Sequence, residues 1–196
     1  MKIELLSKLN GRGYRLNPDQ ISAWYEEHIL GALRHRAAIL RSRTGVLRPG
    51  LADGLSLFGS YLIRLFRDGE LVDARAGGNL IVDVGRALVI DRVQGVGGPP
   101  AVADYLAIGT GTTGPAAGNT TLEAEVGTRI QGTLSQPTAY TDRDVGTFPA
   151  GNGTGAITEA GRLNASTSGT LLCRATFSVI NKAAGDSLQV QYDITD

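Results

Sequence analysis

The first candidate for chemistry is the glycine-rich stretch at residues 108–119, which reads IGTGTTGPAAGN and follows an apolar run at 105–108. A strand leading into such a loop begins many phosphate-binding sites. A Walker-type loop needs a lysine after its glycines, and this stretch has none. Gly109, Gly111 and Gly114 have the spacing of a dinucleotide fingerprint, but Pro115 follows and no apolar helix comes after it. We therefore predict a permissive surface loop whose glycines allow tight or left-handed turns.

The other groups that could do chemistry are isolated from one another in the sequence. His28 and His35 lack the partners of a zinc-binding helix. Cys173 falls on the apolar face of a predicted strand, where cysteine usually behaves as a small hydrophobic residue. Asp142 and Asp144 could offer oxygens to calcium, but without further carboxylates nearby they are more typical of a solvated turn. The sequence therefore predicts a protein that is not an enzyme and has no catalytic residue, cofactor or metal site.

A basic cluster gives the clearest interaction signal. Arginines and a histidine gather within ten residues, and large apolar side chains precede them along the same segment. Basic side chains could contact phosphates, but the cluster lacks interleaved aromatic residues, so a nucleic-acid partner is not favoured. Large aromatic residues often anchor protein interfaces. We predict protein contacts through Trp24, Tyr25, Ile29, Arg34, Arg36, Arg41 and Arg43.

These residues belong to a predicted helix at about 17–43. Asn17 can cap the helix, Pro18 suits its first position, and Gly45 marks its end. An apolar stripe recurs at helical spacing along Ile21, Trp24, Tyr25, His28, Ile29 and Leu33. Residues 1–50 are therefore interpreted as an N-terminal helical arm, whose stripe packs either on its own sheet or on a neighbour.

Residues 51–196 read as an antiparallel β-domain. Asp68-Gly69 predicts a hairpin turn between two apolar strands, and residues 79–82 favour a strand before a short helix that Asp83 could cap. The last two strands alternate, with Leu171 to Val179 and Leu188 to Ile194 each placing apolar residues on one face. The predicted fold class is mainly β, an antiparallel β-sandwich or jelly-roll-like domain preceded by the helical arm.

Charge is unevenly distributed, although the 19 basic and 19 acidic residues balance. Residues 1–48 contain nine Lys/Arg and four Asp/Glu (net +5), and the remainder contains ten and fifteen (net −5). Opposite fields favour head-to-tail contact between copies or contact with an acidic partner. A single cysteine and the lack of a long apolar run predict a chain kept in the cytoplasm, with no membrane partner.

Three stretches resemble small structural proteins of tailed-bacteriophage virions. They are YLAIGTG (105–111), ITEAGRLN (157–164) and GTLLCRATFSVI (169–180), and the broader likeness covers roughly residues 56–196. Arg162 departs from the pattern, because an apolar residue is common at this position of the family.

The resemblance implies a non-enzymatic virion component that is assembled in the host cytoplasm. The preferred reading is a capsid decoration or cement protein that works as a homo-oligomer, for example a trimer, and binds other virion proteins. A tail-fibre, collar or neck adaptor is the alternative. A carbohydrate-binding module and a DNA-binding protein are more remote, since exposed aromatics and reading motifs are lacking.

Overall fold

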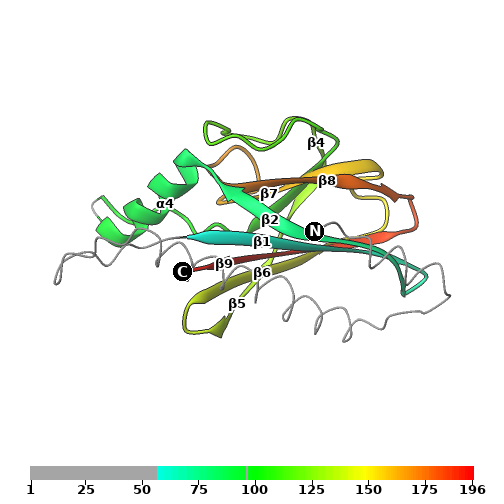
Figure 1. Cartoon of the computed structure of the whole chain (residues 1–196), viewed down its shortest axis with the longest axis horizontal. Coiled ribbons are helices and arrows are strands. Elements are labelled where there is room, and N and C mark those ends of the chain that lie inside the picture. Colours follow the sequence, from blue (N-terminus) through cyan, green and yellow to red (C-terminus); the bar gives the residue numbers. More distant parts are fainter. Residues whose placement is uncertain (1–56, 96) are drawn as a thin grey trace, which may run out of the picture.

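The computed structural model describes residues 57–95 and 97–196, and these form an antiparallel β-structure with one helix among the described residues (Figure 1). The mainly β, antiparallel class predicted from the sequence is confirmed. The predicted helix at 17–43 and the arm boundary at residue 50 lie outside the described residues. The elements are β1 (Phe58–Arg67), β2 (Glu70–Ile81), α4 (Asp83–Gln94), β3 (Tyr105–Gly109), β4 (Glu125–Gln131), β5 (Thr133–Thr138), β6 (Thr141–Phe148), β7 (Gly155–Leu163), β8 (Leu171–Lys182) and β9 (Ser187–Thr195).

One sheet folds over on itself into two layers. Its strand order is β4-β3-β7-β8-β2-β1-β9-β6-β5. The strand β2 connects the two layers, and it pairs with β8 only through Leu80 and Ile81. Figure 1 shows β7 and β8 above β9 and β6. The end strands β4 and β5 are separated in sequence by Gly132 alone. A single bent segment thus pairs with β3 in its first half and with β6 in its second half.

The hairpin predicted at Asp68-Gly69 is confirmed. Both residues have positive φ angles, of 52° and 81°, which the tight turn between β1 and β2 requires. The predicted strand and short helix after residue 79 are confirmed as the end of β2 and α4. However, Val82 rather than Asp83 occupies the N-cap position, without a side-chain cap, and Asp83 lies in the first turn. An acidic residue there still interacts favourably with the positive end of the helix.

The core lies between the two layers. It includes Ile63, Leu106, Ile108, Phe148, Cys173, Val190 and Tyr192, all of which are fully buried. Cys173 is on the core face, as predicted, and burial raises the pKa of its thiol to about 12. A second, smaller apolar cluster of Val82, Ala107, Leu122, Leu163 and Leu171 lies outside the β3–β7–β8 layer.

The prediction that β8 and β9 bury only one face is wrong. Arg174 on β8, and Gln191 and Asp193 on β9, are buried although they point away from the core. The loop after β3 covers the outward side of β8. Near the far end of β8, Val179 is exposed although it was assigned to the buried face, because the β7–β8 register shifts there and Ile180 enters the core instead.

Candidate functional site

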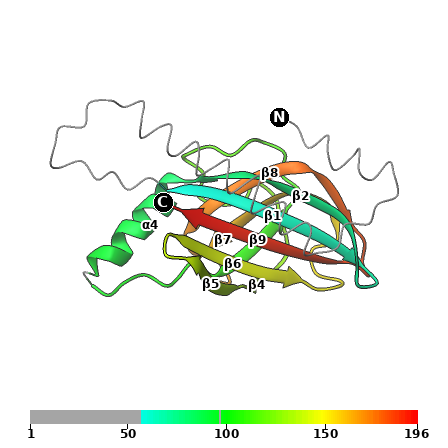
Figure 2. The same cartoon turned by 60° about the horizontal axis from the view of Figure 1, so that its bottom comes forward.

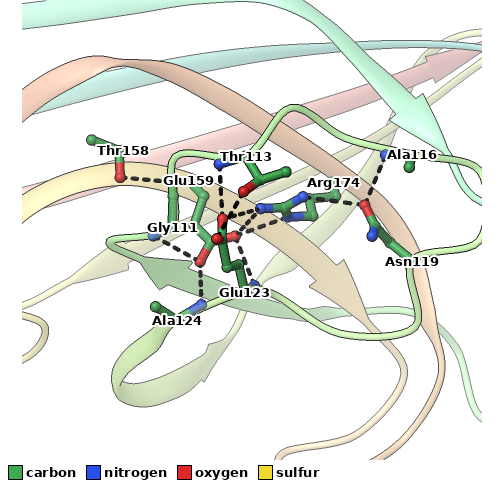
Figure 3. Close-up of polar contacts among 9 residues, drawn as sticks. All are labelled: Gly111, Thr113, Ala116, Asn119, Glu123, Ala124, Thr158, Glu159 and Arg174. Carbon is green, nitrogen blue, oxygen red and sulfur yellow. Dashed lines mark hydrogen bonds and ion pairs between the residues drawn. The ribbon is translucent and has the colours of Figure 1, made fainter.

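The glycine-rich loop is held from below by one buried carboxylate. Glu159 on β7 is inaccessible to solvent, and its Oε1 accepts hydrogen bonds from the backbone N–H groups of Gly111 (3.1 Å) and Ala124 (2.7 Å). Its Oε2 accepts from the N–H of Glu123 (3.1 Å) and pairs with the guanidinium of Arg174 (2.8 Å). Figure 3 shows these donors converging on Glu159 from both ends of the loop.

Two further side chains fix the middle of the loop. Glu123 accepts hydrogen bonds from the N–H and the hydroxyl of Thr113, both at 2.8 Å, and these bonds lower the pKa of Glu123, with Arg174 contributing less. Arg174 also donates to Asn119 Oδ1 at 3.1 Å, and Asn119 Oδ1 accepts from the N–H of Ala116 (Figure 3).

The backbone N–H groups of the loop determine whether it could bind a phosphate. A phosphate loop presents free backbone N–H groups to its ligand. Here the N–H groups of Gly111, Thr113 and Ala124 are bonded to carboxylates of the protein itself. The loop is therefore a structural cover over β7 and β8.

The glycines serve a different purpose from the predicted one. Left-handed φ angles are absent from Gly109, Gly111, Gly114 and Gly118. Instead, a Cβ atom on Gly109 or Gly111 would lie 2.5 Å from Glu159 Oε1. The absence of a side chain allows the backbone to approach the buried carboxylate closely.

Arg162 is fully buried on the opposite, core-facing side of β7. Its guanidinium donates to the Ala103 carbonyl and to Asp142 Oδ2, both at 2.6 Å, and its Nε lies 3.2 Å from Asp144 Oδ2. The prediction of a solvated turn at 142–144 is thus wrong: these residues belong to β6, and Asp144 is completely buried. Burial raises the pKa of Asp144 to about 6, while Arg162 opposes this rise.

The two buried clusters are internally matched. Arg162 lies within ion-pair distance of two carboxylates and so does Arg174, although neither carboxylate oxygen of Asp144 accepts a hydrogen bond. Among the described residues, no group of three or more His, Cys, Asp or Glu side chains could hold a metal ion. No helix of the described residues is long and apolar enough to cross a bilayer.

An open groove at one end of the molecule provides a contact surface of another kind. It has a volume of about 600 Å³ and lies between α4, the β5–β6 turn and the C-terminus. Its walls are mainly apolar, with Asp142 and Asp196 as the acidic groups. The apolar side chains in its walls include Leu57, Val89, Leu134, Tyr140, Leu172 and Ile194.

Exposed apolar side chains occur in the groove and elsewhere at this end of the molecule. Tyr140 is 73% exposed and Val93 81% exposed, and Ile90, Val102 and Leu134 are also exposed. They lie on α4, the segment after it, and the β5–β6 hairpin, which Figure 2 shows at the same end of the molecule. We call Ile90, Val93, Val102, Leu134 and Tyr140 the apolar end surface. Such surfaces are typical of protein contacts.

The interaction residues predicted from the sequence are in another part of the chain. Trp24, Tyr25, Ile29, Arg34, Arg36, Arg41 and Arg43 all lie outside the described residues, so that prediction remains untested.

Neither the two buried clusters nor the apolar end surface was predicted from the sequence. A charged residue inside an apolar strand, as in ITEAGRL and LLCRATF, is the signal that could have indicated the clusters. The end surface has no comparable signal, because its five residues come together only in the folded chain.

Comparison with protein-family models, with curated proteins and with solved structures finds no match.

Proposed function

We propose that this protein is a non-enzymatic structural component of a tailed-phage virion, acting as a capsid decoration or cement protein. The observation that carries the proposal is the contrast between two parts of the described structure. The charged groups that could do chemistry are engaged in internal ion pairs, while apolar side chains gather on one exposed end.

The residues of the phage-like motifs have structural tasks in this fold. Glu159 and Arg174 hold the loop in place, and the lack of a side chain at Gly109 and Gly111 leaves room for the Glu159 carboxylate. Asn164 accepts a hydrogen bond from the Thr170 N–H at 2.6 Å and closes the β7–β8 connection. Motifs that build a scaffold agree with a role in assembly. The two-layered architecture suits the sandwich or jelly-roll-like domains that the resemblance implies.

We expect the apolar end surface to contact a neighbouring virion subunit. The first candidate for this subunit is another copy of the same chain. Several weak contacts repeated on a lattice give avidity without one strong interface. The basic residues Arg34, Arg36, Arg41 and Arg43 remain candidates for contacts with an acidic partner such as the major capsid protein.

Quantitative mass spectrometry of purified virions tests the role. A decoration protein is expected in a copy number comparable to that of the capsid subunit, whereas a tail or collar adaptor is present in a few copies. Absence from purified particles would contradict both.

Substitution tests the surface. Tyr140→Ser combined with Val93→Ser should reduce incorporation about tenfold or more, because aromatic and aliphatic anchors dominate such contacts. Val72→Ser, which changes an exposed apolar residue on β2, is the matched control and should leave incorporation unchanged. Equal incorporation of both variants would exclude the apolar end surface as the contact.

A further inference from the structure

The outward face of the β1–β9–β6 layer is a further surface that needs a partner. Along β1, Tyr61, Ile63 and Leu65 enter the core, so that Ser60, Leu62 and Arg64 point outward. The register places Leu62 opposite Gln191, and Gln191 opposite Val145. We call this surface the outward face, formed by Ser60, Leu62, Arg64, Gln191, Asp193, Arg143 and Val145.

This face is buried. Leu62 is 2% exposed, Gln191 5% and Asp193 0%. Yet β1 packs on β2, β9 and, through the core, β8. Figure 2, in which this layer comes forward, shows no described helix or strand in front of it. By contrast, Val179 at the end of β8 is 42% exposed. No described helix or strand therefore accounts for the burial of this face.

The chemistry of the outward face is mixed. Arg143 forms a two-pronged ion pair with Asp193, with both nitrogen–oxygen distances at 2.8 Å. Arg64 donates to Gln191 Oε1 at 3.2 Å, and Gln191 donates to Asp193 at 3.3 Å. Leu62 lies among these polar groups. A suitable partner offers apolar area together with a few hydrogen-bonding groups.

We propose that the amphipathic segment 17–43 of the same chain packs across the outward face. Its stripe contains Trp24 and Tyr25, whose rings bury apolar area while the indole N–H or the hydroxyl forms a hydrogen bond. The two parts of the chain also carry opposite net charges. Residues 1–56 contain nine basic and five acidic residues (net +4), and residues 57–196 contain ten and fourteen (net −4).

The chain length permits this packing within one molecule. Residues 44–56 can span up to roughly 45 Å when extended. A ten-residue strand such as β1 is about 33 Å long, and a 27-residue helix about 40 Å. The connecting segment can therefore lead back along β1 and place the helix over the strand that follows it. The inference does not depend on the virion role.

If the stripe packs in this way, two sets of side chains in the N-terminal region have different roles. Trp24, Tyr25 and Ile29 would stabilise the protein's own β-structure. Arg34, Arg36, Arg41 and Arg43 would stay available for a partner, since they follow most of the stripe.

Thiol labelling of the full-length protein tests the packing. Cys173 is buried, so it does not compete. A cysteine introduced by Leu62→Cys should react slowly, whereas one introduced by Val179→Cys should react at the rate of an exposed thiol. Adding Ile21→Ser and Ile29→Ser should accelerate labelling of the Leu62→Cys protein by about tenfold or more, as expected for lost protection. Fast labelling of Leu62→Cys without those changes would overturn the proposal.

Cleavage at a protease site inserted between residues 44 and 56 distinguishes the source of the cover. The N-terminal piece should co-elute with the remainder at the mass of a single chain, and the sole tryptophan, Trp24, should stay shielded from acrylamide quenching. Release of the piece with exposed Trp24 would contradict the proposal. Shielding found only in a species of two or more chains would also overturn it, in favour of exchange between copies.

Discussion

Glu159 and Arg162 lie three residues apart on β7, and this odd spacing places them on opposite faces of the sheet. Glu159 holds the loop outside the layer, and Arg162 forms ion pairs with Asp142 and Asp144 inside the sandwich. Burying a charge is costly unless a partner and hydrogen bonds are present. Arg162, where an apolar residue was expected, therefore has a structural reason, namely two carboxylates on β6.

Asp144 should make stability depend on pH. Its pKa is raised from 3.8 to about 6, chiefly by burial. The folded state therefore holds this proton more tightly than the unfolded chain. Stability from the protonated group is fully present below about pH 4 and is lost as pH rises through 6, by on the order of 2–3 kcal/mol. Denaturant unfolding between pH 4 and 8 should show this fall in the wild type and a flatter curve for Asp144→Asn.

Asp186→Asn provides a control of opposite sign. Arg67 holds the pKa of Asp186 down at about 2, so its contribution is present above pH 4 and lost as pH falls toward 2. The Asp186→Asn variant should therefore be less stable than the wild type above about pH 4, and its stability should fall less than that of the wild type between pH 4 and pH 2. Identical pH profiles for the wild type and Asp144→Asn would show that Asp144 does not titrate as described.

At the scale of elements, glycines decide where segments come close. Gly132 joins β4 to β5, its N–H donates to the Asp104 carbonyl at 2.7 Å, and a Cβ atom there would overlap the Asp144 carboxylate. The bend that allows one segment to pair with both β3 and β6 therefore requires a residue without a side chain. Gly109 and Gly111 play the same part beneath the loop.

Two alanine substitutions distinguish a glycine that is required for close packing from a glycine that only makes the loop flexible. Gly109→Ala should destabilise the protein by roughly 1–3 kcal/mol, because its Cβ would collide with Glu159 and the Ala124 carbonyl. Gly114→Ala has open space around it and should stay within about 0.5 kcal/mol of the wild type. Chemical denaturation measures both. Equal effects would indicate that Glu159 does not hold the loop rigidly.

At the scale of the whole molecule, charge and apolar burial act together. The net charges of residues 1–56 and 57–196 are opposite, and the outward face carries both polar and apolar groups. Attraction between exposed charges is screened by salt, whereas apolar burial is not.

Salt should therefore weaken the association of the cleaved N-terminal piece only in part. Raising sodium chloride from low to molar concentration should increase the dissociation constant by about tenfold, with the complex still measurable. Isothermal titration of the separated pieces provides the measurement. Complete loss of binding in salt would assign the contact to charge alone, and an unchanged constant would assign it to the apolar stripe alone.

The sequence by itself determined the local elements, because their signals are local. The Asp68-Gly69 turn, the strand and helix near residue 83, and the alternation along β8 and β9 depend on neighbouring residues. Only the tertiary structure decided that Gln191 and Asp193 are buried, and that Arg174 is buried beneath a loop about fifty residues earlier in the sequence. It also decided that the glycines of the loop meet a carboxylate from β7, and that α4 and the β5–β6 hairpin combine into one apolar end. Contacts of this kind depend on how the sheet curls, which no short stretch of sequence encodes.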